Sequence, residues 1–234
     1  MNPSPKHQCL TDLRERILTT DIAPGSDLDE TELSTSYGIS RTPLREVLQR
    51  LAGDGYVTLL ANRGAKVASM DLSVMRTFFQ TAPLIYSSIA RLAAEHRTTA
   101  QLEDLKAVQS AFAKAVSAAD AQGMALNNHR FHNIIGDMAA NDYLMASLKR
   151  LLIDHTRLGQ MFYRPASPAE AVAVKQASQQ HDAMIAAIEA QESAVVVDLT
   201  LQHWDLSRDR MERFVRPDPL PLDVVDFMEK KNAV

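Results

Sequence analysis

The sequence is short of cysteine and of long apolar runs, and each shortage excludes a class of protein. Cys9 is the only cysteine among 234 residues, so no disulfide framework can form within the chain and a reducing compartment is expected. No apolar run approaches the ~20 residues that cross a membrane, and the first residues lack the hydrophobic core of a signal peptide. The sequence therefore predicts a cytoplasmic protein with no membrane partner.

Positive charge is also scarce overall, but it is concentrated in one region. The formal net charge is −4 at pH 7, which argues against a chain that binds nucleic acid through charge alone. Basic residues nevertheless cluster on one predicted helix and the hairpin after it, namely Arg41, Arg45, Arg50, Arg63 and Lys66. A local patch of this kind can still release counterions from a DNA backbone. This distribution favours weak nonspecific DNA binding that needs base contacts as well.

A helix with two different faces is predicted from about residue 41. Its apolar residues follow the i, i+3, i+4, i+7 spacing of a buried stripe and are Leu44, Val47, Leu48 and Leu51. Ser40 or Thr42 can cap the helix, and Pro43 suits its first turn. A second face presents guanidinium and amide groups from Arg41, Arg45 and Gln49. Taken alone, this pattern also fits an ordinary amphipathic helix with a solvated face.

The neighbouring segments predict a winged helix-turn-helix. Residues 28–37 form a short helix in which Asp29 and Glu32 have the spacing of a capping box. Gly38 suits the left-handed residue that ends such a helix. Two strand-like runs joined by a short turn come after the second helix, at residues 56–60 and 65–68. Helix, tight turn, helix and hairpin is the order of elements in a winged helix-turn-helix.

These residues resemble the DNA-binding domain of the GntR family of bacterial transcription regulators. The matching runs are residues 40–48 (SRTPLREVL), 54–57 (DGYV) and 62–64 (NRG), and the resemblance covers about the first third of the chain. It implies a homodimer that binds a double-stranded DNA operator. The helix face and the hairpin tip supply the expected DNA contacts, which are Ser40, Arg41, Thr42, Arg45, Gln49, Arg63 and Gly64.

The rest of the chain is helical, without strands. Helices are expected near residues 72–95, 99–119, 121–139, 141–164, 168–190 and 193–214. The short loops between them imply antiparallel neighbours in a bundle. The predicted fold is therefore mainly α. Its expected parts are a winged helix-turn-helix domain over residues 1–70, an all-helical domain over 71–216 and a tail over 217–234.

Three histidines of the predicted bundle lie on the apolar stripes of three different helices. They are His132, His181 and His203, and Asn128 lies one turn before His132 on the same face. Any one of them alone is best explained as a hydrogen-bonded core histidine. Burying several unpaired imidazoles is costly, however, and converging imidazoles are what a divalent transition metal selects.

The same residues resemble the C-terminal effector domain of GntR regulators called FCD. The matching segments are residues 128–132 (NHRFH), residues 180–188 (QHDAMIAAI) and His203. The resemblance implies a divalent metal ion, zinc or nickel, held by His132, His181 and His203. Asn128 takes the position at which the family has an acidic ligand, and His129 is the reserve ligand if the helix is rotated.

A small carboxylate is the expected effector in this helical domain. Arg157 could form a bidentate pair with an organic acid, and Tyr86 could donate a hydrogen bond to it. The alternative for Arg157 is an ordinary surface arginine. His155, one turn from Leu151, is a further polar residue that could line the cavity.

The leading functional interpretation is a ligand-responsive, dimeric transcription regulator, with repression as its expected action. The alternative is a metal-dependent enzyme that uses the three histidines, since an open coordination position could serve an oxygenase or a hydrolase. No general base or nucleophile accompanies the histidines at a recognisable spacing, and no Gly-rich phosphate loop is present. A helical scaffold without a ligand is the third possibility. An enzyme would leave residues 40–51 unexplained.

Overall fold

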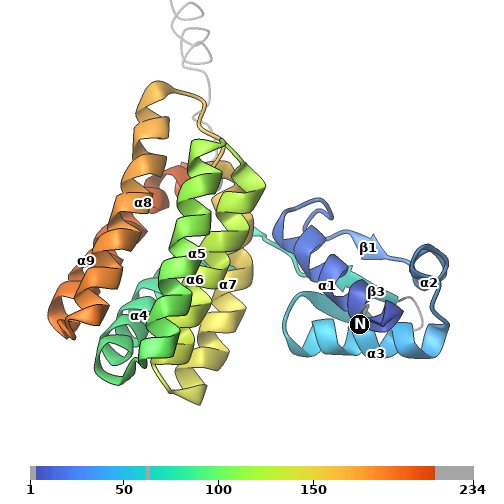
Figure 1. Cartoon of the computed structure of the whole chain (residues 1–234). Coiled ribbons are helices and arrows are strands. Elements are labelled where there is room, and N and C mark those ends of the chain that lie inside the picture. The colour runs from blue at the N-terminus through green and yellow to red at the C-terminus, as the bar shows by residue number, and fades with distance from the viewer. Residues whose placement is uncertain (1–3, 62–63, 214–234) are drawn as a thin grey trace, which may run out of the picture.

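A computed structural model describes residues 4–61 and 64–213, which form a small N-terminal part and a larger helical bundle (Figure 1). Within the described residues the elements, in chain order, are α1 (Pro5–Leu18), β1 (Asp27–Leu28), α2 (Glu30–Tyr37), α3 (Arg41–Gly53), β2 (Val57–Leu60), β3 (Gly64–Val67), α4 (Leu72–His96), α5 (Thr99–Ser117), α6 (Ala121–Met138), α7 (Asp142–Phe162), α8 (Pro168–Glu189) and α9 (Ser193–Arg213). The predicted mainly α fold is confirmed. The predicted tail, residues 217–234, lies outside the described residues, and the predicted domain limits stay predictions.

Local capping explains the helix-turn-helix. The Asp29 carboxylate accepts hydrogen bonds from the backbone N–H groups of Thr31 and Glu32, both at 2.8 Å, and so caps α2. Gly38 has a φ of 61° and ends this helix in the left-handed conformation. Ser40 occupies the cap position of α3, but its side chain makes no capping hydrogen bond. The turn therefore depends on Asp29 and Gly38 rather than on a side-chain cap of α3.

The hairpin pairs with a third strand that the sequence analysis missed. The antiparallel sheet has the order β1-β3-β2, and Leu28 lies opposite Ala65. The prediction that the short helix begins at residue 28 is therefore wrong, because Leu28 is buried within a strand and the helix begins at Glu30, after its cap Asp29. Behind the sheet, the apolar stripe of α3 packs with Leu13 and Ile17 of α1.

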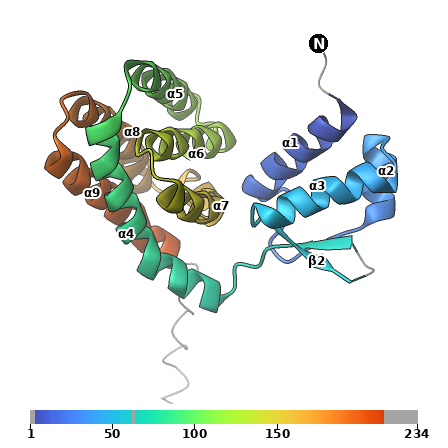
Figure 2. The ribbon, with the colours of Figure 1, turned by 90° about the horizontal axis from the view of Figure 1, so that it is seen from below.

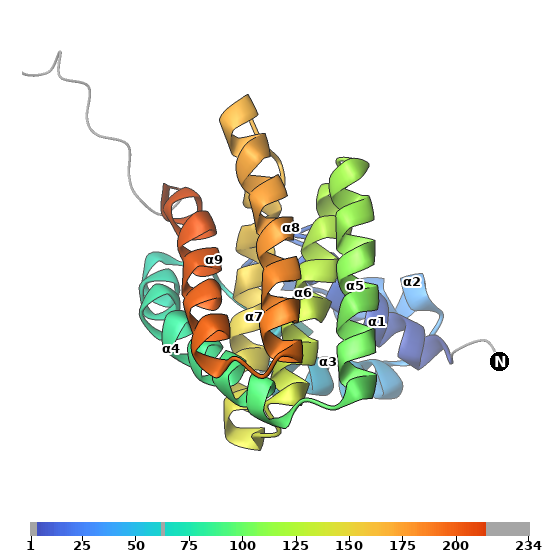
Figure 3. The same ribbon diagram turned by 60° about the vertical axis from the view of Figure 1, so that its left-hand side comes forward.

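The bundle contains helices close to the six predicted ones. A complete capping box between Thr98 and Gln101 starts α5. Figure 3 shows α5 to α9 running along one another, and α4 contacts α6, α7, α8 and α9. Side chains from α4 and from these four neighbours can therefore meet inside the bundle. None of the described helices is long and apolar enough to cross a membrane.

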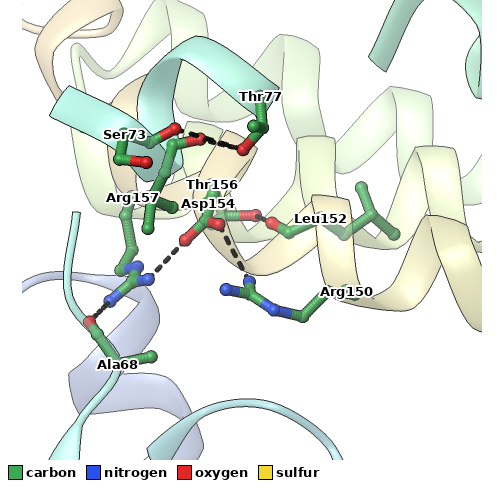
Figure 4. Close-up of polar contacts among 9 residues, drawn as sticks. Ala68, Ser73, Thr77, Arg150, Leu152, Asp154, Thr156 and Arg157 are labelled. Atoms are coloured by element: carbon green, nitrogen blue, oxygen red, sulfur yellow. Dashed lines mark hydrogen bonds and ion pairs between the residues drawn. The ribbon is translucent and has the colours of Figure 1, made fainter. Parts of the chain in front are cut away.

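The two parts meet along α7, which lies beside α1 (Figure 2). Ile153 of α7 is buried within the hydrophobic core of the N-terminal part. Arg157 is 1% exposed, and its Nη1 donates a hydrogen bond to the backbone oxygen of Ala68 at 2.8 Å (Figure 4). Its Nη2 pairs with Asp154, which also accepts a hydrogen bond from Arg150 at 2.8 Å, while its Nε is buried without a hydrogen-bond partner among the described residues. A buried ionic network thus joins α7 to the segment that leaves the sheet.

This network predicts that Arg157→Met destabilises the protein much more than Arg150→Gln. Removing Arg157 takes a partner from the buried Asp154 carboxylate and the donor from Ala68, which should cost about 3 kcal/mol of the free energy of unfolding. Arg150 bonds the same carboxylate, but its side chain is 43% exposed, so its loss should cost about 1 kcal/mol or less. Urea unfolding of both variants measures the difference. Equal losses would contradict a specific role for the buried guanidinium.

Candidate functional site

The polar face of α3 is available for a partner. Ser40, Arg41, Thr42, Arg45 and Gln49 are all exposed, while the opposite stripe of the helix is buried. The Arg45 side chain is 62% exposed, and its Nε lies 3.0 Å from Glu30 Oε2. Glu30 belongs to α2, so the first helix of the pair orients a guanidinium of the second. These side chains can donate hydrogen bonds to base edges and phosphates.

The hairpin tip is only partly described. Arg63, one of the predicted DNA contacts, lies outside the described residues. Gly64 has a φ of +85°, and a Cβ on it would come within 2.5 Å of the backbone oxygen of Leu28. The pairing of β1 with β3 therefore already requires glycine there. The predicted contact of Gly64 with DNA stays a prediction.

Three buried histidines from α6, α8 and α9 converge inside the bundle. His132, His181 and His203 are 4%, 0% and 7% exposed. Each offers a ligand atom, and these atoms all lie within 4.8 Å of one another. The rings of His181 and His203 are closest, with centroids 4.7 Å apart. Helices far apart in sequence thus bring together the three histidines that the sequence analysis had singled out.

Glutamine side chains fix which nitrogen of two histidines faces the cluster. Nδ1 of His181 lies 2.9 Å from Gln109 Oε1, and Nδ1 of His203 lies 3.0 Å from Gln180 Oε1. Because an amide oxygen only accepts, each Nδ1 carries the hydrogen and each Nε2 keeps its lone pair. Gln109 is itself held by donating to Asp182 Oδ1 at 3.0 Å. Hydrogen bonds of this kind orient metal-binding histidines.

Two histidine nitrogens of the cluster, and one oxygen of Asn128 a helical turn before His132, are buried without a hydrogen-bond partner among the described residues. They are Nε2 of His132, Nε2 of His181 and Oδ1 of Asn128, which is 2% exposed. A core histidine held only by hydrogen bonds would have both polar nitrogens satisfied. Buried nitrogen and oxygen atoms with free lone pairs can coordinate a metal cation. The donor set therefore fits a divalent metal ion.

Burial keeps these imidazoles neutral. It lowers the pKa of His132 and of His181 well below the usual value, and the neighbouring histidines add to the effect. Burial also lowers the pKa of His203 to about 4. Neutral imidazole is the form that donates a lone pair to a metal, so at neutral pH no proton competes for the site.

A fourth histidine, His155 of α7, lies beside the cluster. Its ring centroid lies 5.4 Å from that of His132, and its Nδ1 lies 2.7 Å from the Tyr86 hydroxyl. Burial lowers its pKa to about 3. The sequence analysis named His155 as a residue that could line the cavity, and its position seven residues after the buried Leu148 places it on the same helix face. The Tyr86 ring is perpendicular to that of His132, with centroids 5.2 Å apart, and its predicted contact with an effector stays a prediction.

Two other sequence predictions need correction. Arg157 was expected to line the histidine cavity, but its guanidinium is taken up by Asp154 and Ala68 at the seam with the N-terminal part. It lies two residues from His155, and that spacing places the two side chains on different sides of a helix. His129, the reserve ligand, has its Nδ1 2.8 Å from Thr156 Oγ1 and is not among the clustered ligands of the described residues.

The cavity beside the histidines is very small. It is lined in part by His155, His203 and Tyr163 and has a volume of about 10 Å³. That is about the space of one water molecule. A ligand larger than water can enter only if the surrounding helices move.

Comparison with protein families places the two parts separately. Residues 6–67 match the bacterial regulatory proteins of the gntR family, and residues 80–206 match the FCD domain. The FCD match alone spans more than half of the chain. Regulators of this kind bind DNA operators, and FCD domains bind small-molecule effectors.

Individual relatives agree with these matches. The HTH-type transcriptional repressor RspR of Escherichia coli K12 is 25% identical over 191 residues, which is 82% of each chain. A fatty acid metabolism regulator protein of Enterobacter sp. strain 638 is 41% identical over 92 residues, 38% of this chain and 34% of the relative. The structure of E. coli McbR/YncC covers 92% of this chain and 100% of its own with a TM-score of 0.77. At 18% identity that likeness shows the fold alone.

Proposed function

Because the chain belongs to the GntR family of bacterial regulatory proteins and carries an FCD domain, we propose that it represses transcription as a homodimer whose metal site binds a small carboxylate. The observation that carries the proposal is the convergence of three buried histidines, of which His132 and His181 have a buried Nε2 without a hydrogen-bond partner. A relative that covers 82% of the chain is named a repressor, which supports repression rather than activation of transcription. The family consists of transcription regulators, so the enzyme alternative is set aside.

DNA recognition rests on the exposed face of α3. Arg41 and Thr42 stand at the start of the helix, where the recognition helix of such domains approaches base edges. Arg45 follows one turn later and is held by Glu30. In a dimer, two such helices face successive half-sites about one turn of DNA apart. A pseudo-palindromic operator follows from this symmetry.

Arg41→Ala and Arg45→Ala should each weaken binding to an operator selected from random duplexes by the wild-type protein. The loss should be about 1–3 kcal/mol for a base-reading arginine. Lys114→Ala, an exposed change on α5, is the matched control and should bind normally. Fluorescence anisotropy at a fixed salt concentration measures the affinities. Wild-type affinity in the folded double variant would refute the assignment.

The metal proposal assigns His132, His181 and His203 as ligands, with the Asn128 oxygen beside them. Zinc and nickel both accept imidazole ligands. When bound, the ion would polarise and hold a carboxylate oxygen at its open position. Gln109 and Gln180 position two of the rings through their Nδ1 atoms. The neutral Asn128 predicts weaker binding than an aspartate would give.

Purified protein offered zinc or nickel should bind one ion per chain. Replacing a group that only orients a ligand lowers metal affinity about 10–100-fold. Gln109→Ala should therefore lower the affinity by about that factor, and His181→Ala, which removes a ligand, should lower it further. Asn128→Asp should tighten binding. His96→Ala removes an exposed histidine outside the cluster and should have no effect. Competition with a chelator gives the affinities. Protein that stays free of both ions, with unchanged thermal stability, would support a purely structural histidine cluster.

The effector proposal follows from the size of the cavity. A carboxylate does not fit in about 10 Å³, so its binding must displace α7, α9 or both. His155 faces the cluster from α7, while Asp154 and Arg157 of the same helix hold the seam. Displacing α7 therefore disturbs the contact with Ala68, at the end of the sheet. The placement of α3 relative to its dimer mate would change with it.

A thermal-shift screen of small mono- and dicarboxylic acids against the metal-loaded protein should yield stabilising ligands that weaken operator binding. Linkage requires reciprocity, so a tenfold loss of operator affinity means a tenfold loss of ligand affinity in the DNA complex, about 1.4 kcal/mol. Metal-free protein is the control and should give no hits. The proposed switch fails if hits persist in the His203→Ala variant or leave operator affinity unchanged.

A further inference from the structure

A second, larger cavity lies between the N-terminal part and the bundle. Its volume is about 570 Å³, within the usual size of small-molecule sites. The N-terminal part supplies Arg14, Arg50 and Tyr56, and the bundle supplies Lys149 and Arg150. Neither part forms this cavity alone. It is separate from the histidine cluster, none of whose proposed ligands lines it.

Positive charge predominates on its walls. The four basic side chains face one lining carboxylate, Asp54. Arg14 and Arg50 both pair with Asp54, the Arg50 Nε at 3.7 Å, and Arg150 pairs with Asp154, which does not line the cavity. No ion pair to Lys149 is found in the part of the chain that the structure describes, and Nε of Arg14 is buried there without a hydrogen-bond partner. The cavity therefore has more cationic groups than its own carboxylate can neutralise.

The fold places these cations by close packing. Arg14 lies over the Tyr56 ring, 5.8 Å from its centroid. Gly55 has a φ of +88°, and a Cβ there would come within 2.8 Å of Arg150 Cδ. The turn after α3 favours glycine because of this φ, the missing Cβ leaves room for Arg150 to pack there, and Asp154 holds the guanidinium. Two of the four cations are fixed before any ligand arrives.

The cavity does not belong to the DNA-binding face. Arg50 and Gly53 stand at the C-terminal end of α3, whereas Arg41 and Thr42 stand at its N-terminal end. A helix of 13 residues separates its ends by roughly 18 Å. A phosphate of DNA bound at the start of α3 is therefore distant from this cavity.

We propose that this cavity binds a small multivalent oxyanion, a phosphorylated or polycarboxylate metabolite, and so clamps the two parts in one relative placement. Arginine and lysine side chains converging from two sides are suited to such an anion. An anion that bridges Arg50 and Lys149 would stabilise the arrangement in which they face each other. The regulator then has a second input that does not pass through the histidine cluster.

The test titrates the full-length protein with inorganic phosphate at constant ionic strength and follows its thermal stability. Phosphate should stabilise the wild-type protein saturably. The double variant Arg50→Gln, Lys149→Gln should bind phosphate about tenfold more weakly, because it loses charged hydrogen bonds to the anion. Lys175→Gln, an exposed lysine of α8 outside the cavity, is the matched control. A second arm uses succinate in the His203→Ala background, where the histidine site is impaired. Comparing the arms distinguishes phosphate from carboxylate ligands.

A saturable effect of either anion that requires Arg50 and Lys149 supports the proposal. An effect that follows ionic strength alone, or that the double variant and Lys175→Gln share equally, overturns it. Displacement of phosphate by a random-sequence DNA duplex, lost in the double variant, would also overturn it, because the cavity would then hold a DNA backbone. The double variant must first show the wild-type unfolding temperature without anion. If the double variant unfolds at a lower temperature, the single variant Lys149→Gln, at an exposed position, is used instead. This single variant must lower the affinity for phosphate severalfold.

Discussion

The arrangement of the two parts depends on the burial of one guanidinium. Arg157 is removed from water, so its charge must be balanced by a carboxylate and its N–H groups by protein oxygens. Asp154 supplies the charge and Ala68 supplies an oxygen. That oxygen belongs to the segment between β3 and α4. Its Nη1 can reach this oxygen only while α7 stays against the end of the sheet, so a local hydrogen-bonding requirement sets a long-range placement.

This requirement makes α7 the helix that both sites share. Asp154 and Arg157 face the seam, whereas His155 faces Tyr86 and His132 inside the bundle. Neighbouring residues of a helix point about 100° apart, so one rigid segment serves two sides. A movement that enlarges the cavity at His155 cannot leave the contact with Ala68 unchanged. The histidine cavity and the seam at Ala68 are therefore coupled directly through α7, without a chain of intermediate residues.

Sequence reasoning succeeded where the signal was local. The 3.6-residue periodicity gave the helices, Gly38 marked the turn, and the apolar stripes placed three histidines inside. It failed where the deciding partner is distant. Arg157 pairs with Asp154 three residues before it, but its other acceptor, the backbone oxygen of Ala68, lies 89 residues away, and no pattern near Arg157 indicates that contact. Likewise β1 has two residues and exists only because β3 pairs with it, so no periodicity could reveal it.

The lack of a carboxylate at residue 128 supports an anionic effector for the proposed metal site. Three neutral imidazoles and the amide of Asn128 carry no negative charge, so a divalent ion held by them would keep both of its charges in a buried site. An aspartate at residue 128 would have balanced one of them. Keeping an unbalanced charge out of water is costly, and an anionic ligand at the open position removes that cost. Metal and carboxylate should therefore strengthen each other's binding, and this dependence should be steeper with Asn128 than with an acidic residue in its place.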